Sequence, residues 1–120
     1  MEFSSFKDWV EKLINISKEK NVYVVVEGKN DVRRLKLYGV ESIYPIKGRK
    51  FYDVVEDLEF ANLCILLTDL DKQGEKIFLK LKSLLQREGI PVDVSFREYL
   101  KNFPYEEIEN LPDIKDTSET

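Results

Sequence analysis

The chain contains no histidine and a single cysteine, and these two absences exclude several kinds of chemistry. Without an imidazole there is no histidine general base, no histidine–cysteine nucleophile pair and little scope for zinc binding. Cys64 lies inside an apolar run, so the sequence offers neither a disulfide framework nor zinc-ligand spacing. Any acid–base or metal chemistry has to come from other side chains.

Long apolar runs are also missing. No stretch approaches the roughly 18 apolar residues that cross a bilayer, and the N-terminal region lacks the apolar segment of a signal peptide. The formal net charge of -4 argues against a protein that wraps nucleic acid non-specifically, although it leaves room for local basic patches. We therefore expect a cytoplasmic protein that makes no membrane contact.

Length and patterning predict one domain with additions at both ends. A chain of 120 residues corresponds to a single domain. Apolar residues recur at helical spacing over 3–14, so an N-terminal helix within 1–20 is expected to pack on the core. The main domain is assigned to 21–103. The C-terminal tail is assigned to 104–120, and its polar end, 113–120, is expected to fray.

Within the main domain, strand-type and helix-type patterns alternate, which favours a parallel sheet with right-handed crossovers. The continuous β-branched run at 22–26 is typical of a strand buried on both faces. We predict an α/β fold: a Rossmann-like, three-layer arrangement in which helices flank a four-stranded, mainly parallel sheet of order 2-1-3-4. The predicted strands are 22–26, 43–46, 63–68 and 91–96, and the predicted helices between them are 31–38, 51–60 and 75–88.

Two of these strands end in acidic residues. The first strand, 22–26, is followed by Glu27, and the third, 63–68, by Asp69 and Asp71. An open parallel sheet binds its ligands beyond the carboxyl ends of the strands, where the strand order reverses. In the order 2-1-3-4 the first and third strands are neighbours. We therefore expect the three carboxylates to meet at this edge of the sheet.

These carboxylates suit magnesium and phosphate chemistry. Mg²⁺ takes one or two protein carboxylates and completes its shell with water and phosphate oxygens. The i, i+2 spacing of Asp69 and Asp71 points both side chains to one side of an extended strand end. Glu27 either joins the metal site or acts as general acid or base, because nearby like charges raise its proton affinity. We predict a Mg²⁺ or Mn²⁺ site built from Glu27, Asp69 and Asp71. Turns around it are assigned to Gly28, Gly48 and Gly74.

Basic residues gather at the same strand ends. An acidic protein can in this way present a basic rim that positions a phosphate backbone without reading its bases. Taken singly, a lysine or arginine is more often a solvent-facing residue than a ligand contact. Phe51 and Tyr52 follow the basic turn and either stack on a base or pack in the core. The nucleic-acid-binding candidates are Lys29, Lys47, Arg49, Lys50 and Lys72.

The two acidic motifs together resemble a known family. Glu27-Gly28-Lys29 after one strand and Asp69-x-Asp71-x-x-Gly74 after a later one are similar to the Toprim (topoisomerase–primase) domain, and the resemblance covers about 22–96. Within that family the residues of the two motifs are similar to those of small stand-alone Toprim proteins of archaea and bacteria and to those of the Toprim core of the 5S ribosomal RNA maturase. The resemblance implies that Glu27 is a general acid/base, and that Asp69 and Asp71 bind magnesium, in phosphodiester cleavage or transfer.

Two classes of function remain open. Topoisomerases and primases need further domains for which a chain of this length has no room, so neither activity is expected of it alone. The first class is a magnesium-dependent nuclease or phosphodiester-transfer enzyme acting on RNA or DNA. The second is a non-catalytic nucleic-acid-binding or ribonucleoprotein adaptor with a vestigial metal site. A small phosphorylated ligand is disfavoured because there is no Walker loop or dinucleotide glycine fingerprint. A partner protein, or a homodimer through the edge strand at 92–96, is compatible with both classes.

Overall fold

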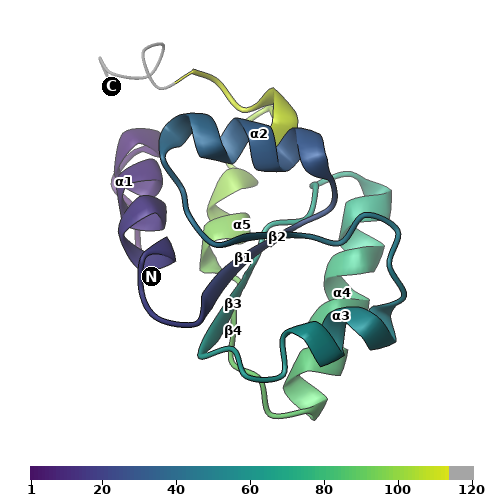
Figure 1. The fold of residues 1–120 in the computed structure, drawn as a ribbon. Helices are drawn as coiled ribbons and strands as arrows, with labels where there is room; N and C mark the ends of the chain where they lie inside the picture. Colours follow the sequence, from purple (N-terminus) through teal and green to yellow (C-terminus); the bar gives the residue numbers. More distant parts are fainter. Residues whose placement is uncertain (114–120) are drawn as a thin grey trace.

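The computed structural model describes residues 1–113, in which strands and helices alternate along the chain (Figure 1). The fraying predicted for the last residues concerns 114–120, outside the described residues. The strands are β1 (Val22–Val26), β2 (Ile43–Pro45), β3 (Leu63–Leu66) and β4 (Val92–Asp93). The helices are α1 (Phe6–Ser17), α2 (Lys29–Tyr38), α3 (Phe51–Asp57), α4 (Lys72–Arg87) and α5 (Ser95–Leu100), followed by the 3-10 helix η1 (Ile108–Asn110).

The four strands form one parallel sheet in the order β2-β1-β3-β4, which confirms the predicted fold class and strand order. Val25 of β1 pairs with Tyr44 of β2 on one side and with Leu66 of β3 on the other. Pairing continues past the end of β1, because the Lys47 N–H donates to the Glu27 carbonyl oxygen at 2.8 Å. The carboxyl ends of these three strands therefore lie side by side.

Both faces of the sheet are covered, which explains why β1 is apolar at every position. Side chains alternate between the faces of a strand, so Val24 and Val26 face one layer and Val25 the other. The first layer contains α1, α2 and α5, and the second contains α3 and α4 (Figure 1). This is the predicted three-layer arrangement. No helix within residues 1–113 combines the length and the apolar character needed to cross a bilayer.

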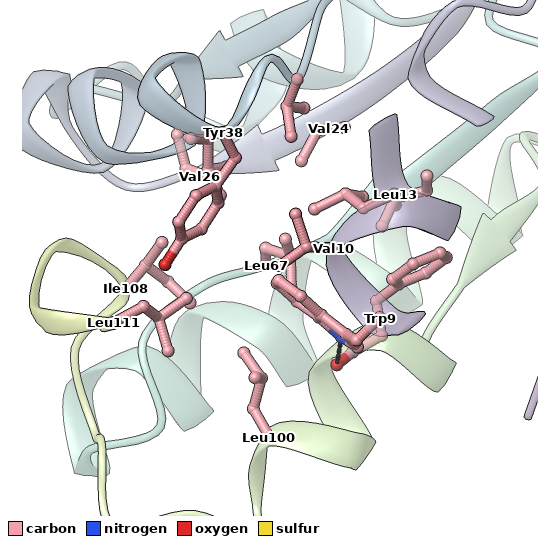
Figure 2. Close-up of a cluster of buried hydrophobic side chains, with 14 of the residues drawn as sticks. Trp9, Val10, Leu13, Val24, Val26, Tyr38, Leu67, Leu100, Ile108 and Leu111 are labelled. Carbon is pink, nitrogen blue, oxygen red and sulfur yellow. Dashed lines mark hydrogen bonds between the residues drawn. The ribbon is translucent and has the colours of Figure 1, made fainter. Parts of the chain in front are cut away.

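Helix α1 is part of the core. Its first turn is capped by Ser5, whose Oγ accepts the Asp8 N–H at 3.0 Å. Trp9 is fully buried, and its indole N–H donates to the Phe96 carbonyl oxygen at 2.9 Å (Figure 2). Moving α1 away from α5 would leave this buried indole N–H without a partner, which is unfavourable. The bond therefore stabilises the contact between the two helices.

Residues 104–113, which we call the C-terminal strap, also pack on the core. Ile108 and Leu111 are buried and lie near Val26 and Tyr38 (Figure 2). The Tyr38 hydroxyl donates to the Pro112 carbonyl oxygen. The sequence assigns this segment to a tail, but its two apolar side chains complete the layer that contains α1 and α2.

The boundary between β4 and α5 differs from the sequence prediction. A strand was predicted over 91–96, whereas β4 ends at Asp93 and α5 begins at Ser95. The cause is the Asp93 side chain, whose Oδ1 accepts hydrogen bonds from the N–H groups of Ser95 at 2.9 Å and Phe96 at 3.3 Å. Such a local bond turns the chain out of the strand. Most of the stretch proposed for sheet extension in a homodimer is therefore not strand.

Candidate active site

Glu27 and Asp69 meet at the ends of β1 and β3. The Asp69 backbone N–H donates to Glu27 Oε2 at 2.7 Å. Glu27 is also fixed through its backbone, whose carbonyl oxygen accepts the Lys47 N–H. The glutamate is thus held between the strand ends on either side of it. Within residues 1–113, no hydrogen bond engages its other carboxylate oxygen, Oε1.

Asp69 is anchored at three of its polar groups. Its N–H binds Glu27, its Oδ1 accepts the Ile108 N–H at 2.9 Å, and its carbonyl oxygen accepts from Arg97 Nη2 at 2.7 Å. These contacts come from β1, the C-terminal strap and α5. In the described part of the chain, Oδ2 of Asp69 receives no hydrogen bond. This oxygen is the one left for a ligand.

Asp71 stands at the N-cap of α4. Its Oδ1 accepts the Gly74 N–H at 2.7 Å, a standard helix-capping contact. The predicted metal ligand therefore has a local structural task as well. The two roles are compatible, because the cap uses one carboxylate oxygen and the second remains available for an ion.

The three predicted turn glycines differ in whether the backbone at their position requires glycine. Gly74 lies inside α4, where a Cβ would stand 1.9 Å from the Asp69 carbonyl oxygen, so close backbone approach demands glycine there. Gly48 has φ +71 in the loop after β2, a left-handed conformation that favours glycine. Gly28, the N-cap of α2, has an extended φ of -147, and a Cβ there would meet nothing within 4 Å.

A fourth carboxylate, Asp31, belongs to the same cluster. It has a capping role at the start of α2, because Asp31 Oδ2 accepts the Gly28 N–H at 3.0 Å. It is buried, with 5% of its surface exposed, and burial raises its pKa. Its charge in turn raises the pKa values of Glu27 and Asp69. Spacing alone did not reveal this coupling, because a capping aspartate and a site aspartate look the same in sequence.

Electrostatics at this cluster are unfavourable to ionised carboxylates. Burial, reinforced by the charges of Glu27, Asp31 and Asp71, raises the pKa of Asp69 to about 7. Burial also raises the pKa of Glu27, and the charges of Asp71 and Asp31 raise it further. Acids placed this close are stabilised by bound protons or by a cation.

The donor chemistry fits magnesium. Carboxylate oxygens are the ligands that Mg²⁺ prefers, and it commonly uses only one or two from the protein. Among residues 1–113, no group of three or more His, Cys, Asp or Glu side chains is arranged to hold a metal ion. The site therefore fits an ion held by one or two carboxylates, with water and substrate oxygens completing the shell. The ligand roles of Glu27, Asp69 and Asp71 stay a prediction.

The five predicted nucleic-acid-binding residues are all exposed and lie at the strand-end side of the sheet. Lys29 and Lys72 are the first residues of α2 and α4 and lie within the two acidic motifs. The other three, Lys47, Arg49 and Lys50, lie in the loop between β2 and α3. Arg49 pairs with Asp57 Oδ2 at 2.9 Å, so part of its charge is already balanced.

The two adjacent aromatic residues of α3 line different cavities. Phe51 is half-buried and lines a cavity of about 210 Å³ that also includes Glu27, Arg49 and Gln73. Tyr52 is 76% exposed and borders a separate groove of about 550 Å³ between α3 and α4. Of the two, Phe51 is the aromatic side chain that adjoins the acids.

Arg97 is a site residue that the sequence does not reveal. It is 1% exposed, and its guanidinium donates to the Thr68 and Asp69 carbonyl oxygens and to Glu75. In sequence it is a single arginine near the start of a short helix, a pattern typical of a surface residue. Only the fold shows that it lies under the loop that carries Asp69.

No family model matches the chain. A solved structure described as a putative protein from Aquifex aeolicus is 35% identical, covers 90% of this chain and 99% of that chain, and superposes with a TM-score of 0.83. The chain belongs to the same family as this Aquifex protein. A second structure, the zinc-binding and RNA polymerase domains of the Aquifex aeolicus primase, is 22% identical over 76% of this chain and 25% of that chain, with a TM-score of 0.49. That likeness is too weak to support a conclusion.

Homologues among curated proteins are UPF0292 proteins. The Thermococcus sibiricus protein is 28% identical over 106 residues, which cover 88% of this chain and 84% of that protein. The Methanosarcina barkeri protein is 27% identical over 94 residues, and the match spans about two thirds of its length, 66%. These likenesses establish relatives and fold, and leave the chemistry to be inferred from the site.

Proposed function

We propose that the protein is a Toprim-type enzyme that uses Mg²⁺ or Mn²⁺ to cleave or transfer phosphodiester bonds in RNA or DNA. The observation that carries this proposal is the 2.7 Å hydrogen bond between Glu27 and Asp69, which joins two strand-end acids at the point where the strand order reverses. The resemblance of the motifs around these residues to the Toprim domain supports the same function.

Glu27 is the proposed general acid/base. Its pKa is raised by burial and by neighbouring acids, which suits proton exchange closer to neutral pH. Because Oε2 is bonded to the Asp69 N–H, Oε1 is the atom that would take a proton from an attacking water or give one to the leaving oxygen. Glu27 also lines the cavity beside Phe51, which is where the proposal puts the reacting part of the substrate.

Asp69 and Asp71 are the proposed metal ligands, through the carboxylate oxygens that the fold does not use. Asp69 keeps Oδ2 for an ion after Ile108 has taken Oδ1, and Asp71 keeps Oδ2 after capping α4. When bound, magnesium supplies Lewis-acid stabilisation to the phosphoryl oxygens. The Gly74 N–H is taken by the Asp71 cap, and the N–H groups of Lys72 and Gln73 before it in the first turn of α4 would favour a phosphate nearby.

Substrate binding is assigned to the basic residues around the acids. Phosphate contacts from lysine and arginine position a nucleic acid without reading its sequence, which fits a rim formed by Lys29, Lys72 and the loop 47–50. Phe51, which lines the same cavity as Glu27, is the aromatic residue to which we assign contact with a base or sugar of the substrate.

The test is divalent-dependent cleavage of structured RNA and single-stranded DNA by the purified protein. Glu27→Gln and Asp71→Asn are expected to abolish turnover with the fold intact, whereas Glu56→Gln, on the exposed face of α3, keeps it. Circular dichroism and thermal melting check the fold of each variant. Cleavage that survives in both site variants would refute the assignment.

A non-catalytic adaptor is the second candidate. It is favoured by the lack, within residues 1–113, of three acids arranged around one ion and by the exposure of all five basic residues. An adaptor would bind RNA or DNA in a salt-dependent way, and replacing Lys47, Arg49 and Lys50 would weaken that binding. Asp71→Asn would leave it nearly unchanged.

A further inference from the structure

Arg97 is buried beneath the loop that links β3 to α4. Its Nε donates to the Thr68 carbonyl oxygen at 3.0 Å and its Nη2 to the Asp69 carbonyl oxygen at 2.7 Å. Its Nη1 pairs with Glu75 Oε1 at 2.8 Å. One guanidinium on α5 therefore donates hydrogen bonds to two successive carbonyl oxygens of the acid-bearing loop and forms an ion pair with the first turn of α4.

This arrangement compensates for burying a charge. Removing a guanidinium from water is strongly unfavourable unless its donors are satisfied, and here all three nitrogens have partners. The guanidinium also lies 4.4 Å from the centroid of the Phe78 ring, a cation–π contact. The planar fork of arginine suits two adjacent carbonyls, which a lysine ammonium cannot engage in the same way.

The direction of these contacts matters for the site. Arg97 binds the carbonyl oxygen of Asp69, while the carboxylate of Asp69 is turned to Ile108 and its Oδ2 stays unengaged within residues 1–113. An arginine paired with the carboxylate itself would neutralise it and would compete with a metal ion. Arg97 can therefore hold the loop in place without neutralising the Asp69 carboxylate.

Contacts with Gly74 of α4 also hold the backbone of this loop. Thr68 Oγ1 donates to the Gly74 carbonyl oxygen at 2.9 Å. The Asp69 carbonyl that Arg97 binds packs directly against Gly74, where a Cβ would be only 1.9 Å away. The backbone at 68–69 thus has little room to shift as long as Arg97 is present.

We propose that Arg97, oriented by Glu75, is a positioning residue that sets the Thr68–Asp69 backbone so that Asp69 meets Glu27 and presents its carboxylate to an ion. The part of this inference that concerns an ion rests on the proposed function. The part that concerns loop geometry does not, and the two are tested separately.

The geometric part is tested by amide hydrogen exchange in the metal-free full chain. In Arg97→Lys and Arg97→Ala, the amides of Asp69, Leu70 and Ile108 should exchange at least about tenfold faster, while those of β1 and β3 keep their protection. Arg87→Ala, an exposed arginine of α4, is the matched control and should change none of them. Unchanged protection at Asp69, or a loss spread evenly over the molecule, would overturn the proposal.

The ion part is tested by Mn²⁺ titration of the same variants. Arg97→Lys should bind Mn²⁺ at least about tenfold more weakly than the unmodified protein, in line with the loss expected when a supporting group of a metal site is removed. Millimolar guanidinium should restore binding to Arg97→Ala but not to Asp69→Asn. If the unmodified protein binds Mn²⁺ and Arg97→Lys binds it equally well, the ion part of the proposal is overturned.

The two proposals can fail independently. If the unmodified protein binds no divalent ion, while the Arg97 variants still lose protection at Asp69, Leu70 and Ile108 and keep it in the sheet, the metal site is refuted and the positioning of the loop stands. If Arg97→Ala does not fold, Arg97→Lys and Glu75→Gln carry the test, because each keeps a polar group at the contact between positions 97 and 75.

Discussion

The backbone N–H of Asp69 donates to the side chain of Glu27 at 2.7 Å, although the two residues are 42 positions apart in the chain. The glutamate is therefore both a proposed proton-transfer group and the acceptor that ties the end of β3 to the end of β1. Substitutions at Glu27 should separate these two tasks, since a glutamine keeps an acceptor and an alanine does not.

We expect Glu27→Gln to fold more stably than Glu27→Ala. Both variants remove the same charge from the acidic cluster, but alanine leaves the half-buried Asp69 N–H without its partner. The expected difference is about 1–3 kcal/mol in the free energy of unfolding. Urea denaturation of the two variants measures it. Equal stabilities would mean that the hydrogen bond contributes nothing, and both variants should be inactive in any case.

Stability should fall with rising pH when no divalent ion is present. The pKa of Asp69 is raised from 3.8 to about 7 in the folded protein, so the folded state binds this proton more tightly than the unfolded state does. Linkage then makes the contribution of Asp69 most favourable below pH about 4 and progressively less so up to pH about 7. Melting temperatures measured across this window should decline.

Asp69→Asn provides the control for that pH dependence. Asparagine keeps an acceptor for the Ile108 N–H and removes the titrating group. The variant should melt a few degrees higher than the unmodified protein at neutral pH and show a flatter profile, while Glu56→Gln behaves like the unmodified protein. If Asp69→Asn retains the full decline, another group causes it.

Replacement by alanine should destabilise the protein at Gly74 and have little effect at Gly28. Gly74→Ala places a methyl group 1.9 Å from the Asp69 carbonyl oxygen, so the loop or the start of α4 must move. We expect a loss of about 1–3 kcal/mol, the range for overpacking at a buried position, together with a loss of activity. Gly28→Ala meets nothing within 4 Å and should be within about 1 kcal/mol of the unmodified protein. Thermal and chemical denaturation compare the pair.

Phe51 and Tyr52 form a matched aromatic pair for testing nucleic-acid contact. Phe51 adjoins Glu27 in the 210 Å³ cavity, and Tyr52 faces the other groove. Phe51→Leu, which retains an apolar side chain, should weaken binding of single-stranded oligonucleotides by the roughly 1–3 kcal/mol of one stacked base. Tyr52→Leu should have little effect. Fluorescence anisotropy with Ca²⁺ in place of Mg²⁺ measures both, and equal losses would place the strand elsewhere.

The sheet could be predicted from sequence because its pattern is local. Buried parallel strands such as 22–26 and 63–66 are contiguous apolar runs, and the helices between them repeat at helical spacing. Once the order was inferred, the meeting of Glu27 and Asp69 followed from topology alone. The ends of elements were less predictable, as at Asp93, where a single side chain ends β4.

The supports of the site could not be predicted, because they depend on contacts between distant residues. Arg97 donates hydrogen bonds to carbonyl groups 28 and 29 positions away in the chain, and the Ile108 N–H donates to Asp69 across 39 positions. Neither residue has a motif, and neither lies near the acids in sequence. Their roles appear only when α5 and the C-terminal strap are placed in space.

These supports also have a consequence for synthesis of the chain. All four strands of the sheet are complete once Asp93 has been added, yet the groups that hold Asp69 from α5 and the strap, Arg97 and Ile108, are still to come. The residues that secure Asp69 are therefore synthesised after every residue of the sheet. A chain ending at 93 would contain all four strands but neither support, so the sheet and the site have different sequence requirements.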